Sequence, residues 1–265
     1  MERDLYVFCG HHKAGTLWFI RMLASVCFEI GLKGAYIPTP KTFNFNLKKH
    51  IDENEIDFIW YANADMKYLN QLDNYNGFHV IRDPRDTVVS SYFSHKNSHP
   101  TNDWPELIEH RKKLQSVGVD EGLMMELDFS KTLSTNGIDL NMFDALRKWD
   151  YSKDNLMEFK FEECIKSPEV MFLDVLRFLG ILSVPGEEND KTKISEERAC
   201  HIVEKNSFKS QAKGREIGQS DEKSHYRKGV AGDWENHFRE QHKKYFKELF
   251  DDLPVFLGYE EHNNW

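Results

Sequence analysis

Residues 5–23, LYVFCGHHKAGTLWFIRML, decide the fold because they join an apolar run to a helical pattern through a turn that contains glycine. The run 5–9 is bounded by charge and glycine, which is typical of a buried strand, and apolar residues recur at helical spacing from Thr16 onward. A strand, a tight turn and a helix N-terminus direct several backbone N–H groups to one point, where the helix dipole adds partial positive charge. The stretch therefore predicts an anion-binding loop.

The loop is close to the phosphate-binding motif G-x-x-x-x-G-K-[ST] but lacks its lysine. Gly10 and Gly15 hold the two glycine positions, whereas the lysine lies inside the turn as Lys13. From there its ammonium could reach a phosphate oxygen or the bridge to a transferred group, and Thr16 could add a hydroxyl donor. For this loop taken alone, a glycine turn that merely reverses the chain is the alternative.

The composition indicates one globular domain over residues 1–265, of which 40% are hydrophobic and 30% are charged. A net charge of -9 argues against nucleic acid or an anionic membrane surface as partner. Any anion site must then be a local cluster of cations in an acidic background.

The sequence also favours a cytoplasmic protein. No apolar run approaches the roughly 20 residues of a membrane span, and the first residues lack the pattern of a secretory signal. The cysteines are scattered without C-x-x-C spacing, which argues for a reducing compartment and against a zinc site or a disulfide framework. They are Cys9, Cys27, Cys164 and Cys200.

Strands and helices alternate along the chain, which predicts an α/β fold with a mainly parallel sheet covered on both faces. Apolar runs at 56–62, 77–81 and 154–161 are typical of strands, and helical spacing recurs at 167–180, 195–208 and 236–250. Two segments interrupt the alternation. Residues 97–139 are expected to form a helical insertion or lid, and residues 214–234 a long functional loop.

A second cluster lies in HVIRDPRDTVVSSYFSH, residues 79–95. Arg82 ends a predicted strand, at the sheet edge where open parallel sheets bind ligands, and Ser90 falls on the helix that follows. A planar guanidinium near a hydroxyl suits a phosphate monoester. The alternative is a surface ion-pair network at the turn 82–86.

A third cluster, SHYRKGVAGDW at residues 224–234, lies in the predicted long loop. Arg227 and Lys228 stand beside Gly229, so two cations adjoin flexible backbone and could close over a doubly charged ligand. A solvated basic patch is the alternative.

Together these segments resemble the motifs of the cytosolic-type sulfotransferases, which use 3′-phosphoadenosine 5′-phosphosulfate (PAPS). HHKAGTLWF (11–19) is similar to the K-[SA]-G-T-[TS]-W loop of that family, and residues 79–95 resemble its strand-and-helix motif for the 3′-phosphate. YRKGVAGDWENHF (226–238) resembles its R-K-G-x-x-G-D-W segment, while FKFEECIKSPEVMFLDVLRFLG (159–180) and NSF (206–208) are weaker matches. The matches keep the order of the family from Leu5 to Phe238.

The resemblance implies a P-loop-like three-layer fold with a central, mainly parallel five-stranded sheet flanked by helices. It also implies transfer of a sulfo group from PAPS to a hydroxyl or amine, which leaves 3′-phosphoadenosine 5′-phosphate (PAP). Lys13 would stabilise the leaving phosphate oxygen, Trp18 would stack on adenine, and Arg82 would take the 3′-phosphate. The cofactor-binding set implied by the resemblance is Lys13, Ala14, Gly15, Thr16, Leu17, Trp18, Arg82, Ser90, Ser207, Phe208, Arg227, Lys228 and Gly229.

No metal is expected in such a site. Nucleotide kinases use a hydroxyl at the end of their loop to hold magnesium against a multiply charged triphosphate, whereas a sulfo group carries less charge. A lysine and backbone donors could then suffice, so the sequence predicts transfer without magnesium.

The chain departs from the family pattern at the general base. The family has a histidine in K-x-H-x-P after its second strand, whereas residues 58–69 read FIWYANADMKYL and contain none. Asp65 is the first candidate to replace it, with a helix cap as its alternative role. His11 and His12 are the next candidates, and His95 and His99 come third.

Two cofactor contacts depart from the family as well. Leu17 stands where the family loop has a second hydroxyl residue, and Phe161 stands where it has a tyrosine near adenine. Each change removes one hydroxyl from the implied site.

The acceptor is expected to be a small apolar alcohol or phenol, because aromatic side chains occur where variable loops would surround it. The aromatic candidates are Trp60, Tyr61, Phe93 and Trp104. Two other functions stay open: a PAPS- or PAP-binding protein without catalysis, which the missing histidine suggests, and a nucleotide kinase that uses ATP. The sequence leaves the oligomeric state open.

Overall fold

A computed structural model describes residues 5–102, 104–187 and 190–265, and their contacts divide them into two compact units. Unit 1 runs up to Ile81 and resumes over Trp149–Gln211, while unit 2 comprises Arg82–Lys148 and Ala212–Trp265. That residues 1–265 form one domain stays a prediction. Within the described ranges, no helix combines the length and the apolar character that crossing a membrane requires.

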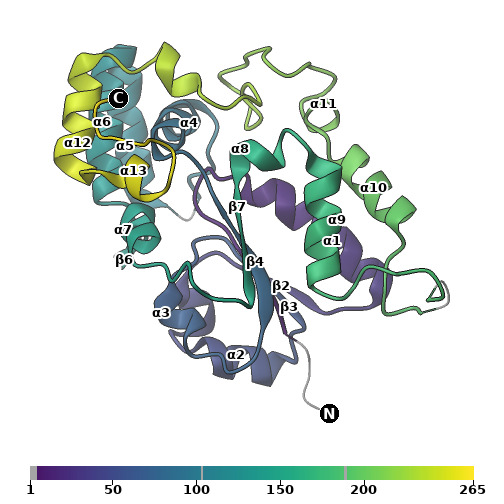
Figure 1. The fold of residues 1–265 in the computed structure, drawn as a ribbon. Coiled ribbons are helices and arrows are strands. Elements are labelled where there is room, and N and C mark those ends of the chain that lie inside the picture. The colour runs from purple at the N-terminus through teal and green to yellow at the C-terminus, as the bar shows by residue number, and fades with distance from the viewer. Residues whose placement is uncertain (1–4, 103, 188–189) are drawn as a thin grey trace. The chain divides into compact units, whose positions relative to one another are not determined.

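Unit 1 is built on a parallel five-stranded sheet with the strand order β2-β3-β1-β4-β7 (Figure 1). The strands are β1 (Tyr6–Cys9), β2 (Gly34–Ile37), β3 (Phe58–Tyr61), β4 (Asn76–Ile81) and β7 (Leu156–Lys160). The apolar runs in the sequence predicted each of these strands except β2. That strand lies at the edge of the sheet and buries only Ile37 fully, so its apolar signal is weak.

Helices cover both faces of this sheet, so unit 1 has three layers (Figure 1). Phe8 of β1 packs on the face that carries α1 (Thr16–Ile30), α9 (Pro168–Phe178) and α10 (Glu196–Lys205). Val7 and Cys9 pack on the opposite face with η1 (Pro40–Phe43), α2 (Leu47–Asn54) and α3 (Met66–Leu69). Because successive strand residues point to opposite faces, a strand buried on both faces reads as a continuous apolar run. The expected fold class is confirmed.

Two short helices complete unit 1. Helix α8 (Phe161–Cys164) follows β7 directly, and α11 (Phe208–Gln211) lies at the end of the unit. Both begin at aromatic residues that come from the weaker sequence matches.

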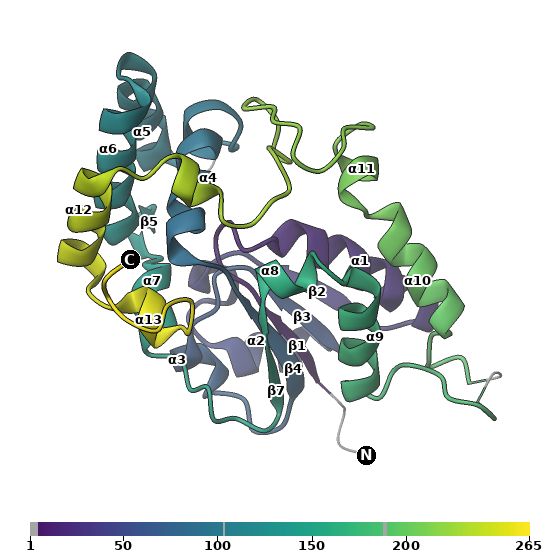
Figure 2. The ribbon, with the colours of Figure 1, turned by 45° about the horizontal axis from the view of Figure 1, so that its top comes forward.

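Unit 2 is mainly helical. Its elements are α4 (Pro84–Asn97), α5 (Pro105–Ser116), α6 (Val119–Lys131), β5 (Ser134–Thr135), β6 (Ile138–Asp139), α7 (Met142–Arg147), η2 (Asp233–Asn236), α12 (Glu240–Phe250) and α13 (Leu253–Phe256). Helix α4 packs against α5 and α6, and α6 packs against α12 (Figure 2). The predicted insertion 97–139 is helical with a small antiparallel hairpin, and the predicted loop 214–234 has no helix or strand before η2.

Candidate functional site

The loop between β1 and α1 is fixed to the end of β3. The N–H of Gly10 donates to the carbonyl of Tyr61 over 2.8 Å, and the N–H of Ala64 donates to the carbonyl of Gly10 over 3.0 Å. Inside the loop, the hydroxyl of Thr16 donates to the carbonyl of His11 over 2.7 Å. These bonds hold the turn in one conformation.

Lys13 and Gly15 give the loop its shape. Both have left-handed backbone, with φ of 63° and 77°. Gly15 is the N-cap of α1 and supplies no side-chain hydrogen bond to the helix. The N-terminal N–H groups of α1 therefore lack a side-chain cap, and such a helix end binds anions. A left-handed lysine costs of order 1 kcal/mol, and strain of this kind is concentrated at functional sites.

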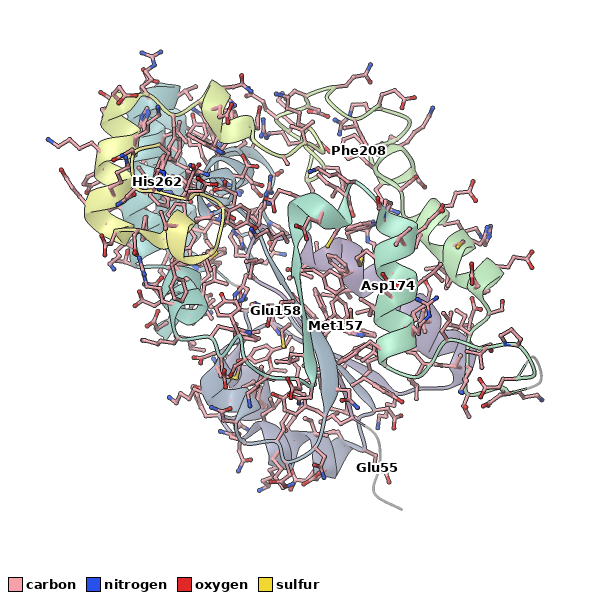
Figure 3. The ribbon with its side chains drawn as sticks, viewed as in Figure 1. Glu55, Met157, Glu158, Asp174, Phe208 and His262 are labelled. Atoms are coloured by element: carbon pink, nitrogen blue, oxygen red, sulfur yellow. The ribbon has the colours of Figure 1, made fainter. Side chains whose placement is uncertain are left out.

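The rings of Phe161 and Trp18 adjoin this loop within unit 1, which also contains the aromatic residue Phe208 on α11. The ring of Phe161, at the start of α8, packs against Gly15. Trp18 meets Phe161 edge to face, with ring centroids 6.4 Å apart and planes at 87°. Phe208 opens α11 (Figure 3), and the hydroxyl of Ser207 before it accepts from the N–H of Ser210 over 3.4 Å. Aromatic faces of this kind can stack on a purine.

Arg82 follows β4 at the start of unit 2, and its guanidinium faces Asp86 at 3.7 Å. The carboxylate of Asp86 accepts from the N–H groups of Gly232 over 2.7 Å and Trp234 over 2.8 Å. Burial raises the pKa of Asp86, although Arg82 lowers it. Asp86 thus joins the second and third motifs, and Ser90 lies half-buried on α4.

The turn 82–86 also contains the ion-pair network that was the alternative for this motif, but the network is buried. Arg85 is 2% exposed and pairs with Asp83 over 2.7 Å and with Glu260 over 2.6 Å. Its guanidinium also lies 3.8 Å from the ring centroid of Trp234 and 4.5 Å from that of Trp265. Arg85 is therefore a structural residue of unit 2.

Asp233 forms ion pairs with both cations of the third motif. Its two oxygens lie 2.5 Å from Lys228 Nζ and 2.5 Å from Arg227 Nη2, and 3.3 Å from His237 Nε2. Burial alone would raise the pKa of Asp233, but hydrogen bonds from His237, Lys228 and Arg227 hold it far below its usual range. The solvated-patch alternative is therefore wrong for Arg227 and Lys228. Gly229 after them has left-handed backbone, with φ of 70°.

Sequence reasoning missed Arg215, which holds the long loop of unit 2. Its guanidinium donates to the carbonyls of Gln219 over 2.8 Å, Arg227 over 3.0 Å and Tyr226 over 2.5 Å. The segment before the motif is thereby tied to the motif itself. Nothing in the sequence pattern distinguishes Arg215 from a surface cation.

The candidates for the general base lie in different surroundings. Asp65 caps α3, because its Oδ1 accepts from the N–H of Lys67 over 2.8 Å. The capping role that was its alternative is therefore present. His12 is half-buried in the loop of unit 1. In unit 2, His99 is half-buried and His95 is buried.

Nδ1 of His95 lies 2.9 Å from Oε1 of the Glu126 carboxylate. The other carboxylate oxygen lies 2.8 Å from Nε2 of His110. Glu126 is buried, and interaction with these histidines lowers the pKa of its carboxyl against the effect of burial.

His11 belongs to a chain of hydrogen-bonded side chains, with His79 buried and Glu158 partly exposed, whose other members the sequence prediction did not include. Its Nε2 lies 2.7 Å from Nε2 of His79, and Nδ1 of His79 lies 2.6 Å from Oε2 of Glu158. The indole N–H of Trp149 donates to Oε1 of Glu158 over 2.8 Å. The available signal was a histidine and a glutamate inside apolar runs that predict buried strands.

The aromatic residues expected around the acceptor are largely core residues. Tyr61, Phe93 and Trp104 are 0%, 4% and 8% exposed. Trp60 packs against the core that contains Phe8. Their contact with an acceptor stays a prediction.

Comparison with known proteins gives one consistent result. A family model described as Sulfotransferase domain matches residues 4–260. Sulfotransferase 2A6 of Mus musculus is 25% identical over 179 residues, which are 67% of this chain and 55% of that protein. Cytosolic sulfotransferase 11 of Arabidopsis thaliana is 28% identical over 100 residues, which are 38% of this chain and 28% of that protein. The chain thus spans about half, or less, of the length of these curated relatives.

Solved structures share the fold. The mouse sulfotransferase SULT7A1 complexed with PAP has a TM-score of 0.58 at 19% identity, over 96% of this chain and 85% of that one. Retinol dehydratase in a complex with retinol and PAP has a TM-score of 0.53 at 17% identity, over 96% of this chain and 82% of that one. At these identities the likeness establishes the fold alone.

Proposed function

The chain belongs to the sulfotransferase domain family, and from this premise we propose that it transfers a sulfo group from PAPS to a small acceptor. The observation that carries the proposal is the loop after β1, where Lys13 and the left-handed Gly15 precede the N-terminus of α1. Donors fixed at a helix end, with an ammonium group inside the same turn, suit a phosphosulfate whose leaving oxygen gains negative charge.

The cofactor contacts that the sequence implied form part of this proposal. Lys13 would act on the leaving phosphate oxygen, Trp18 beside Phe161 would stack on adenine, and Arg82 would bind the 3′-phosphate. The hydroxyl of Thr16 donates to His11 within the loop, so we expect its side chain to hold the loop in shape. The remaining members are Ala14, Gly15, Leu17, Ser90, Ser207, Phe208, Arg227, Lys228 and Gly229.

The reaction is an in-line displacement. The acceptor oxygen forms a bond to sulfur while the bond from sulfur to the 5′-phosphate oxygen breaks, and PAP leaves. Charge develops on that phosphate oxygen, and the ammonium of Lys13 together with helix N–H groups would stabilise it. These donors belong to the chain itself, so we propose that transfer needs no magnesium.

The acceptor class and the location are also proposals. A small apolar alcohol or phenol remains our expectation for the acceptor, with an amine as the alternative nucleophile. A cytoplasmic location fits four cysteines that are all free thiols.

Calorimetric titration of the purified chain with PAP in excess EDTA tests the cofactor assignment. We expect binding that weakens at least about tenfold in Lys13→Ala and Arg82→Ala, since each loses a charge-assisted hydrogen bond. The exposed lysines Lys41 and Lys113 provide charge-matched controls as Lys41→Ala and Lys113→Ala, which should bind as the parent does. Binding of ATP with magnesium and no binding of PAP would replace the proposal by the kinase alternative.

A further inference from the structure

A chain of hydrogen-bonded polar side chains links the anion-binding loop to β4 and β7 of unit 1, with its two histidines buried and Glu158 at its partly exposed end. The parallel register of β4 and β7 places His79 opposite Glu158. Figure 3 labels Glu158 and its neighbour Met157 on β7, whose side chains point to opposite sides of the strand. The indole of Trp149 stacks on the imidazole of His79 at 3.7 Å and donates to Glu158. His11 and His79 are 2% and 0% exposed.

The hydrogen bonds of this chain fix the two imidazole tautomers once the charge of Glu158 is given. An ionised Glu158 accepts from Nδ1–H of His79, which leaves a lone pair on Nε2 of that ring. Nε2–H of His11 then donates to this lone pair, so the lone pair of the His11 ring lies on its Nδ1 atom. That Nδ1 atom is buried and has no hydrogen-bond partner among the described residues.

We propose that His11, His79 and Glu158 form a proton relay for the sulfo transfer, with Nδ1 of His11 as the atom that receives the proton of the acceptor hydroxyl. The inference rests on the proposed function. His11 stands two residues before Lys13 in the anion-binding loop, so the relay ends in the same loop as the group proposed to act on the leaving oxygen. A base can take the proton directly or through one water.

The acceptor oxygen forms its bond to sulfur, the sulfur–phosphate oxygen bond breaks, and the hydroxyl proton passes to Nδ1 of His11. His11 releases its Nε2 proton to His79, and His79 releases its Nδ1 proton to Oε2 of Glu158. The products are a sulfate ester, PAP and a protonated Glu158. After the products leave, protons move back along the same hydrogen bonds from Glu158 to Nδ1 of His11, which gives its proton to solvent, so that both tautomers are restored.

The electrostatics of the chain favour movement of the proton toward Glu158. Burial, and then His79, hold the pKa of His11 well below its usual range, and burial lowers the pKa of His79 to about 3. Burial raises the pKa of Glu158 to about 8, although the hydrogen bond from Trp149 lowers it. Of His11, His79 and Glu158, Glu158 therefore holds a proton most firmly.

The groups around Glu158 are consistent with its role as the final proton acceptor of the relay. Besides His79 and Trp149, the thiol of Cys9 on β1 and the phenol of Tyr151 face it. Burial, with the charge of Glu158 second, raises the pKa of both groups, so both stay neutral. A purely structural core would gain nothing from an unpartnered buried nitrogen on His11, since an apolar side chain would pack there without the desolvation cost.

Glu158→Gln tests the relay because the amide can still accept from Trp149 but cannot take the proton. We expect the kcat for PAPS with phenol to fall about 10²-fold, in the range of general base catalysis, with the Kd for PAP unchanged within about twofold. With 4-nitrophenol, which is largely ionised near pH 8, the loss should be much smaller because no proton remains to be moved. Glu163→Gln, which removes an exposed carboxylate three residues beyond Lys160, is the matched control.

The pH dependence of kcat provides a second test, because removing a residue with a purely structural role would not change the shape of this profile. In the parent chain, kcat with phenol should rise with pH and level off above about pH 8, where Glu158 is ionised. The Gln variant should lose that rise. An unchanged kcat with phenol, or an equal loss with phenol and 4-nitrophenol, would overturn the relay.

Histidine NMR with nitrogen-15 labels separates this inference from the proposed function and needs no acceptor. The relay requires that His11 be protonated at Nε2 and His79 at Nδ1 above about pH 8, and that both tautomers reverse as Glu158 takes up its proton. Tautomers that stay fixed between about pH 6 and 9 would overturn the relay even if PAP binds. Failure to bind PAP would remove the proposed function whatever the tautomers do.

Discussion

The ring of Phe161 covers the α-carbon of Gly15, so that a methyl group there would lie 2.5 Å from Cε2 of the ring. Gly15 also has φ of 77°, which side chains other than that of glycine rarely adopt. Two independent constraints therefore require glycine at the N-terminus of α1. The ring of Phe161 therefore contacts both the loop and Trp18.

Gly15→Ala should therefore displace Phe161 and weaken PAP binding at least about tenfold, since the backbone strain alone costs roughly 1–3 kcal/mol. Calorimetry with PAP measures this loss. Phe161→Ala in the same chain should restore part of the affinity by removing the clash, but not the part due to the backbone. Gly118→Ala is the control, because Gly118 also precedes a helix, has φ of -71° and has open space around it. If Gly15→Ala binds PAP with the affinity of the parent, the anion-binding loop does not require glycine at this position.

Lys13→Ala should lower kcat more than it lowers affinity, because the proposed role of the ammonium is to stabilise charge that develops only during transfer. A loss of about 10²–10³-fold in kcat, comparable with removal of an oxyanion-hole donor, is expected. Steady-state kinetics with PAPS and phenol measure it, with Lys41→Ala as control. If KM for PAPS rises while kcat stays at the parent value, Lys13 only binds the cofactor.

Asp233 should support stability against acid. Its folded pKa is depressed by His237, Lys228 and Arg227, so its contribution is present above the unfolded pKa of about 4 and is lost as the pH falls below it. Asp233→Asn should be less stable near neutral pH, and the difference from the parent should stay constant down to about pH 5 and shrink as the pH falls further, toward about 2. Urea unfolding at several pH values measures this. Glu222→Gln, an exposed site in the same loop, should follow the parent curve.

Arg85→Ala should destabilise the fold, because it leaves the carboxylates of Asp83 and Glu260 without their common partner. Removing one member of a buried ion pair costs about 3–5 kcal/mol. Lys244→Ala, which breaks an exposed pair with Glu248, should cost about 0–1 kcal/mol. Chemical unfolding followed by tryptophan fluorescence is suitable, since Trp234 and Trp265 both contact Arg85. Equal losses in the two variants would contradict the buried network.

The sequence predicted the parts of the fold in which local pattern and burial agree. Strand β1 is apolar on both faces and is followed by a glycine turn, so strand, loop and helix could all be predicted. Strand β2 could not, because Gly34 and Tyr36 of this edge strand are only partly covered. The fifth strand was expected only from the family resemblance.

At the candidate site, motif residues could be predicted and their partners could not. Arg227 and Lys228 were visible as cations, but the spacing alone did not show that Asp233 would hold both. Similarly, His79 and Glu158 are far apart in the chain, and only the register of β4 and β7 brings them together. Pairings of this kind depend on tertiary structure, which a single sequence does not report directly.

Transfer of radioactive sulfate from labelled PAPS to phenol and to a panel of small alcohols and amines, in excess EDTA, shows whether this chain is a sulfotransferase. We expect a labelled ester and one equivalent of PAP for each transfer, unaffected by added magnesium and nearly abolished in Lys13→Ala. PAP binding without any labelled product across the panel would instead support a binding protein without catalysis. If the chain neither binds PAP nor forms a labelled product, it is not a PAPS-dependent sulfotransferase.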